Sequence, residues 1–138
     1  MTTLTTGGFH HIVLTVSDLA RSFKFYTEVL DFKLNAGSVE AGRLFLINGS
    51  MVIGLGLPPD SIQTPVFDQF NENRMGLDHL SIGVESYEIL ENALEVLDQN
   101  EVPHGQIKDL SPAGFPVCVL AFRDPDNIQL ELAAPAPA

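Results

Sequence analysis

The chain has a single cysteine, few basic residues and no long apolar run. Cys118 is the only cysteine among 138 residues, so an internal disulfide is excluded, and we interpret it as a reduced thiol in the core. Only 7 basic residues accompany 18 acidic ones, which gives a formal net charge of -11. Such a surface repels phosphate groups, so we expect neither nucleic acid nor an anionic membrane as a partner.

Two further features that the sequence lacks bear on its location. No apolar stretch approaches the ~20 residues that a membrane-spanning helix requires. The first residues, MTTLTTGGF, have neither the basic stretch nor the apolar core of a signal peptide. We therefore expect a cytoplasmic protein.

What is present is a pattern that occurs twice. A strand-like alternation in HHIVLTV precedes a helical pattern in SDLARSFKFYTEVLDF, and two strand candidates follow, GRLFLIN and SMVIGLGL, joined by the turn pair Asn48 and Gly49. Further along, DHLSIGV indicates a strand and ESYEILENALEVLDQN a helix. Three more strand candidates end the pattern: VPHGQIK, FPVCVLAF and NIQLELA. We therefore interpret each half as strand–helix–strand–strand–strand, with one strand of the first half not located.

This repetition predicts one α+β domain over residues 1–138 that consists of two βαβββ modules. Residues 9–56 form the first module and residues 77–134 the second. Residues 57–76 contain three prolines and show no clear periodicity, so we interpret them as a linker or lid. We expect mixed sheets that form a cup, with the helices on the outer face.

Strand alternation places three potential ligands on the faces that are not needed for helix packing. In the first strand His11 lies opposite the apolar residues, whereas His10 shares their parity and is predicted to point toward the core. In the equivalent strand of the second half His79 lies opposite the apolar residues, and in the last strand Glu131 does. His11 and His79 occupy matching places, 68 residues apart (79 minus 11).

Two imidazoles and one carboxylate on a sheet face form a facial triad, which binds a divalent metal and leaves positions open for substrate. Fe(II), Mn(II), Zn(II) and Ni(II) all suit this ligand set. The simpler alternative is that the histidines are only hydrogen-bonded and Glu131 is a solvated charge on a strand.

The motifs HHIVLTVSDLARSFKFYTEVLDFKL, LDHLSIGV and FRDPDNIQLEL resemble the vicinal oxygen chelate superfamily, which includes glyoxalase I, bleomycin resistance proteins, fosfomycin-modifying enzymes and extradiol dioxygenases. The resemblance covers both halves and implies His11, His79 and Glu131 as metal ligands. It also implies a homodimer, in which His11 and the other two ligands come from different subunits if the modules exchange. Where glyoxalase I has a fourth ligand, a glutamate, this chain has Gly54. That departure argues against a standard glyoxalase I and favours the dioxygenase and fosfomycin-modifying branches.

The resemblance implies a metal-dependent enzyme, either a lyase or isomerase or an extradiol-dioxygenase-like protein, that acts on a small oxygenated organic molecule. No general base is evident, although Glu131 is a candidate catalytic residue. Candidate substrate contacts are Phe67, Phe70 and Arg74 in the linker and Gln129 in the last strand, for which ordinary packing or surface roles are the alternative. The alternative function is a metal-free binding or sequestering protein of the bleomycin-resistance type, whose acidic surface would suit a cationic drug.

Overall fold

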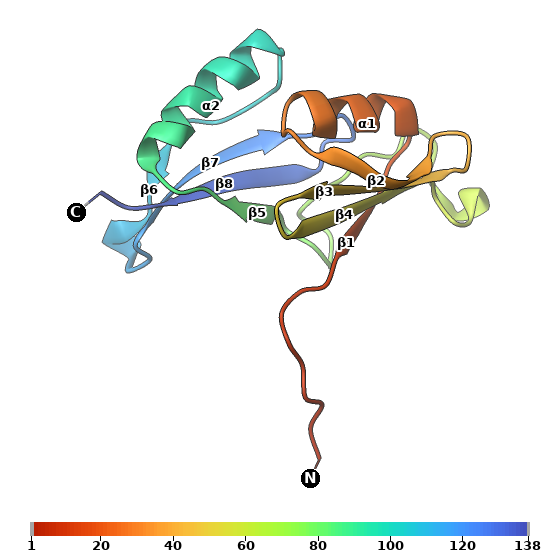
Figure 1. The fold of residues 1–138 in the computed structure, drawn as a ribbon, viewed down its shortest axis with the longest axis horizontal. Coiled ribbons are helices and arrows are strands. Elements are labelled where there is room, and N and C mark those ends of the chain that lie inside the picture. Colours follow the sequence, from red (N-terminus) through yellow and green to blue (C-terminus); the bar gives the residue numbers. More distant parts are fainter. Residues whose placement is uncertain (1, 138) are drawn as a thin grey trace. The chain divides into compact units, whose positions relative to one another are not determined.

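Each half of the chain builds a four-stranded sheet of its own with one helix against it (Figure 1). The computed structural model describes residues 2–137, and the chain divides into two units between Thr64 and Pro65. In both units the first strand pairs in parallel with the last, and the remaining pairs are antiparallel. The predicted α+β fold of two βαβββ modules is confirmed.

The first unit has the strand order β1-β4-β3-β2. Its elements are β1 (Ile12–Thr15), α1 (Leu19–Glu28), β2 (Lys33–Ser38), β3 (Arg43–Asn48), β4 (Met51–Gly56) and the short 3-10 helix η1 (Ser61–Gln63).

The second unit repeats this arrangement with the order β5-β8-β7-β6. Its elements are β5 (Leu80–Gly83), α2 (Tyr87–Gln99), β6 (Lys108–Asp109), the 3-10 helix η2 (Ser111–Ala113), β7 (Val117–Arg123) and β8 (Gln129–Pro135).

Helix α1 begins at a side-chain cap and covers one face of the first sheet. The carboxylate of Asp18 accepts a hydrogen bond from the backbone N–H of Arg21 at 3.0 Å, which satisfies one of the free donors at the helix start. Leu19, Phe25 and Tyr26 are buried on the side of the helix that packs toward β4. Burial of these side chains, rather than helix propensity, accounts for most of the stability of so short a helix.

Helix α2 covers the second sheet in the same way. Its buried residues Leu90 and Leu97 are seven positions apart, so they lie on one side of the helix. That side packs on β7 and β8, where Leu120 and Leu130 are fully buried. The opposite face of each sheet is therefore left to side chains that the helices do not cover.

One buried hydroxyl in the first unit lacks a partner. Among residues 2–137, the Ser22 Oγ is a fully buried side-chain oxygen that makes no hydrogen bond. We expect Ser22→Ala to raise the free energy of unfolding by about 1 kcal/mol, because an unsatisfied buried hydroxyl costs ~1–3 kcal/mol and alanine favours the helix. Urea denaturation measures the change. A less stable variant would mean that the hydroxyl gains more from its surroundings than it loses through desolvation.

Three local predictions differ from the structure. Strand β2 (Lys33–Ser38) lies in a segment for which no strand was located, because its side chains are mostly exposed and a register shift between Leu34 and Ala36 breaks the alternation. The β3–β4 turn consists of Gly49 and Ser50, one residue later than predicted. VPHGQIK is not a full strand, since it contains an isolated bridge from His104 to Phe122 before β6 begins at its last residue.

The described residues contain no helix with the length and apolar character needed to cross a membrane.

Candidate functional site

The second unit brings two of the predicted ligands together on the sheet face opposite α2. In β8 the buried residue Leu130 alternates with Gln129 and Glu131, whose side chains lie on the other face. Ser81 of β5 is the register partner of Glu131, and His79 immediately precedes that strand. Parallel pairing of β5 and β8 therefore places an imidazole beside a carboxylate.

The contact between these two groups has the chemistry of a partial metal site. The His79 Nε2 lies 3.7 Å from the Glu131 Oε1, and the Ser81 hydroxyl donates a hydrogen bond of 2.8 Å to the same oxygen. The His79 Nδ1 faces the other way and contacts the Asp78 carboxylate at 2.7 Å. An imidazole nitrogen and a carboxylate oxygen are ligands that divalent transition metals accept, so this pair fits such a metal. Within residues 2–137 no three His, Cys, Asp or Glu side chains gather closely enough to hold a metal.

The third predicted ligand, His11, belongs to the first unit and is exposed. Its Nδ1 lies 2.8 Å from the Nδ1 of His10, and the two rings meet edge to face with centroids 5.1 Å apart. His10 is exposed as well, so the prediction that it points toward the core is wrong. The reason is that β1 begins only at Ile12, and strand alternation does not govern the residues before it.

The position that carries a glutamate in glyoxalase I is occupied by packed side chains rather than by open space. Gly54 of β4 pairs with Val13 of β1 on one side and with Phe45 of β3 on the other. A Cβ atom at Gly54 would lie 2.9 Å from the Val13 Cγ2 and 3.2 Å from the Phe45 Cε1. Glycine at this place permits the two neighbouring side chains to approach each other.

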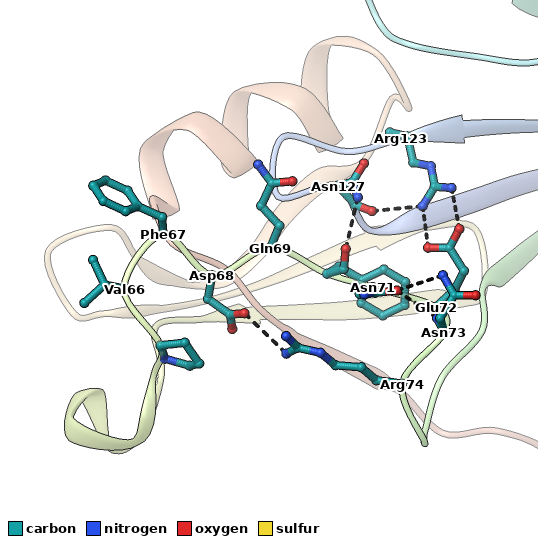
Figure 2. A pocket seen from close by; sticks show the side chains of 12 residues that line it. Val66, Phe67, Asp68, Gln69, Asn71, Glu72, Asn73, Arg74, Arg123 and Asn127 are labelled. Atoms are coloured by element: carbon teal, nitrogen blue, oxygen red, sulfur yellow. Dashed lines mark hydrogen bonds and ion pairs between the residues drawn. The ribbon is translucent and has the colours of Figure 1, made fainter.

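A pocket of about 500 Å³ lies along the segment that follows the unit boundary (Figure 2). Its lining consists of residues 65–74 together with Arg123 and Asn127 from the two ends of the β7–β8 turn. Phe67, Phe70 and Arg74, the three linker residues predicted to contact substrate, all line it. Gln129, the fourth candidate, lies outside this lining.

The three linker residues are placed differently within the pocket. Phe67 is 97% exposed and has a left-handed backbone with φ 57°, and Figure 2 shows its ring pointing away from Arg123. Phe70 is half-buried and its N–H donates to the Asp126 carbonyl at 3.0 Å. The Arg74 guanidinium forms an ion pair with Asp68 at 3.5 Å. Phe67 is therefore an apolar side chain that a ligand could cover.

An ion pair that the sequence did not indicate fixes one wall of the pocket. The Arg123 guanidinium donates two hydrogen bonds, of 2.9 and 2.7 Å, to the two carboxylate oxygens of Glu72. These hydrogen bonds hold the pKa of Glu72 at about 2, below its ordinary 4.5, and the same contact raises the pKa of Arg123. Each residue alone resembles an ordinary surface charge, and only the fold shows that they meet.

This ion pair predicts a difference in acid stability. A carboxyl group whose pKa is lower in the folded than in the unfolded chain stabilises the fold above pH 4.5, and this contribution is lost as the pH falls toward 2. We expect Glu72→Gln to melt at a lower temperature than the parent protein at pH 7, with the two melting temperatures converging between about pH 4.5 and 2. Thermal melts over this range measure the gap. A gap that does not change with pH would show that the charge of Glu72 is not responsible.

The remaining histidine, His104, has partners on both ring nitrogens. Its Nε2 lies 2.9 Å from the Asp98 carboxylate and its Nδ1 lies 2.6 Å from the Gly105 carbonyl. These acceptors raise its pKa, the Asp98 contact most of all. Both ring nitrogens of His104 are therefore engaged within the protein. Cys118 is buried and free, which confirms its interpretation as a core thiol.

Comparisons with known proteins agree with this architecture. The family model described as "Glyoxalase/Bleomycin resistance protein/Dioxygenase superfamily" matches residues 8–132. The chain is similar to the crystal structure of a glyoxylase/bleomycin resistance protein/dioxygenase domain from Frankia sp. EAN1pec, with 32% identity, a TM-score of 0.74 and coverage of 97% of this chain and 96% of the other. No curated protein matches the sequence.

Two more distant structures show the same fold. The fosfomycin resistance protein FosX from Listeria monocytogenes is 21% identical with a TM-score of 0.69, and the match covers 94% of each chain. The lactoylglutathione lyase from Agrobacterium tumefaciens is 15% identical with a TM-score of 0.70, again over 94% of each chain. At these identities the similarity establishes the architecture but not a shared activity.

Proposed function

Because the chain belongs to the glyoxalase/bleomycin resistance protein/dioxygenase superfamily, we propose that it is a metal-dependent enzyme acting on a small oxygenated organic molecule. The observation that carries this proposal is the His79–Glu131 pair, whose Nε2 and Oε1 atoms lie 3.7 Å apart on the sheet face opposite α2. A neutral imidazole nitrogen and a carboxylate oxygen are both electron-pair donors, so a cation between them would relieve the unfavourable approach of two acceptors.

In this proposal His79 and Glu131 supply two ligands and His11 supplies the third. The Nδ1 atoms of both histidines face a neighbouring side chain, which leaves each Nε2 for the metal. Glu131 can bind through one oxygen while Ser81 holds its orientation. Fe(II), Mn(II), Zn(II) and Ni(II) are all compatible with two imidazoles and one carboxylate.

The chemistry proposed is that of a lyase or isomerase, or an extradiol-dioxygenase-like oxygenation. A metal bound by this set would polarise a carbonyl or hold two neighbouring substrate oxygens. Glu131 is the candidate for moving a proton, and the Ser81 hydroxyl that donates to it keeps one of its oxygens in place. Phe67, Phe70 and Arg74 would select the substrate from the pocket beside the Arg123–Glu72 pair.

Metal analysis of protein purified without chelator tests the proposal. We expect about one divalent ion per site in the parent protein, lost on dialysis against a chelator and regained on adding metal. His104→Ala is the matched control, because this histidine is engaged by Asp98 and Gly105, and its removal should leave the metal content unchanged. Protein without metal that still binds a small cationic drug would favour the metal-free sequestering function instead.

We also propose that the chain forms a homodimer. The segment around the unit boundary exposes several large apolar side chains, with exposed fractions of 92% for Ile62, 84% for Val66 and 103% for Met75. Such side chains are often covered by association. Light scattering at micromolar concentration should give twice the 15.0 kDa of one chain. A mass of 15.0 kDa would contradict the dimer without bearing on the metal site.

A further inference from the structure

Asp78, which directly precedes His79, lies where it can determine which His79 ring nitrogen carries the proton. The Asp78 Oδ1 lies 2.7 Å from the His79 Nδ1. An ionised carboxylate only accepts hydrogen bonds, so the His79 Nδ1 must carry the hydrogen. In the neutral ring the free electron pair then lies on Nε2, the nitrogen that faces Glu131.

Asp78 is itself held by a second side chain. The Gln129 Nε2 donates to the Asp78 Oδ1 at 3.0 Å and to the Asp78 carbonyl at 3.3 Å. These contacts restrain an aspartate that is otherwise 70% exposed and free to rotate. The strand alternation that places Gln129 on the face opposite α2 therefore also places its amide beside Asp78.

The orientation of the Gln129 amide is determined by a hydrogen bond to its oxygen. The Gln129 Oε1 accepts a hydrogen bond of 3.3 Å from the Arg123 Nη2. Arginine only donates, so the amide oxygen must face Arg123 and the NH₂ group must face Asp78. Glu72 in turn holds the guanidinium through two hydrogen bonds.

Five side chains form one hydrogen-bond network, and in each of its hydrogen bonds the donor and the acceptor are determined. Glu72 accepts from Arg123, Arg123 donates to Gln129, Gln129 donates to Asp78, and Asp78 accepts from His79. Every member belongs to the second unit. The network begins at the wall of the pocket with the Glu72–Arg123 contact, which Figure 2 shows, and it ends at His79, a proposed metal ligand.

We propose that Asp78 is a positioning residue that holds His79 with its Nε2 presented to the metal, and that Gln129, Arg123 and Glu72 hold Asp78 in turn. The effect on metal binding rests on the proposed metal-dependent function, whereas the hydrogen bonds between these side chains do not. Residues that hydrogen-bond to the far nitrogen of a histidine ligand fix its tautomer, and their loss typically weakens metal binding by ~10–100-fold.

The tautomer of His79 in the metal-free protein is the first readout. Nitrogen-15 NMR of the neutral imidazole ring distinguishes a proton on Nδ1 from one on Nε2. We expect His79 to carry it on Nδ1 in the parent protein and to lose this preference in Asp78→Ala. Asp78→Asn should retain the preference, because the amide oxygen still accepts. His104, whose Nδ1 faces the Gly105 carbonyl, is an internal control that should not change.

Zn(II) titration of the same variants is the second readout. Asp78→Ala should weaken binding ~10–100-fold and Asp78→Asn less. Gln129→Met, which removes the two contacts to Asp78 and the one to Arg123, should weaken it by about 3–10-fold. Glu91→Ala, at an exposed position on α2, is the matched control and should bind as the parent does.

The two measurements test the positioning role of Asp78 and the proposed metal function separately. An unchanged His79 tautomer in Asp78→Ala overturns the positioning role, whatever the metal affinities are. If no variant binds Zn(II) or another divalent metal, but the tautomer still follows residue 78, the positioning holds and the proposed metal function is wrong.

Discussion

His11→Ala is expected to lower the affinity for a divalent metal by at least ~100-fold, whereas His10→Ala should lower it by no more than ~10-fold. The first change removes a direct ligand, and the second removes only a neighbour that contacts the His11 Nδ1 at 2.8 Å. Metal titration followed by a competing chelator measures both affinities. The comparison is well matched, because the two histidines are adjacent, exposed and outside any strand.

The opposite ranking would show that His10 is the ligand. Equal losses in both variants would point to a pair of histidines that bind together, and the facial triad would then be wrong. His79→Ala provides the reference value, since the His79 Nε2 lies 3.7 Å from the Glu131 Oε1 and the loss of affinity should be as large as that in His11→Ala.

Gly54→Glu is expected to reduce the free energy of unfolding by about 3 kcal/mol, and Gly54→Ala by about 1 kcal/mol. Even the first added carbon would lie 2.9 Å from the Val13 Cγ2, so the sheet must shift or Val13 must leave its rotamer. The longer side chain must also displace the Phe45 ring. Urea denaturation of the three proteins gives the two differences.

Gly83 provides the matched control for this pair. It is also a strand glycine, but a Cβ atom there would meet nothing within 4 Å. Gly83→Ala should therefore be neutral or stabilising by up to about 0.5 kcal/mol. A Gly54→Glu protein that is as stable as the parent and binds metal more tightly would show that the new carboxylate reaches the metal, as the glutamate of glyoxalase I does.

Much of the fold could be predicted from the sequence, because many of its features depend on residues that are close together in the chain. The alternation in β8 separated Glu131 from the buried Leu130 correctly. Asp18 directly precedes α1 and caps it through the backbone N–H of Arg21, three residues further on. Asn127 takes a left-handed conformation in the β7–β8 turn, with a φ of 65°. These features depend on neighbours within a few residues.

The wrong predictions concern the positions at which strands begin and end. His10 was assigned a direction by extending strand alternation two residues beyond the start of β1. β2 was not located because its mostly exposed side chains carry no apolar alternation and Gly37, at φ 82°, interrupts it. Strand ends are set by tertiary pairing, which a local pattern does not contain.

Part of the candidate site could not be found from sequence because its contacts join distant residues. Arg123 and Glu72 are 51 positions apart, and so are Gln129 and Asp78. Polar residues at such separations give no signal in composition or periodicity. The one local cue was the Asp78–His79 pair itself, in which a carboxylate directly precedes a candidate ligand.

The position of the two histidines next to β1 and β5 has a consequence for the order of folding. Each of these four-residue strands ends its four-stranded sheet and pairs in parallel with a strand about 40–50 residues further along, as Ile12 with Ile53 and Leu80 with Leu130. Hairpins such as β3–β4 and β7–β8 close over a few residues and form early, whereas closing a long loop has a greater entropic cost. We therefore expect β1 and β5 to be the last strands to join their sheets and the first to open, and a metal held by the proposed ligands would stabilise the least protected hydrogen bonds of each sheet.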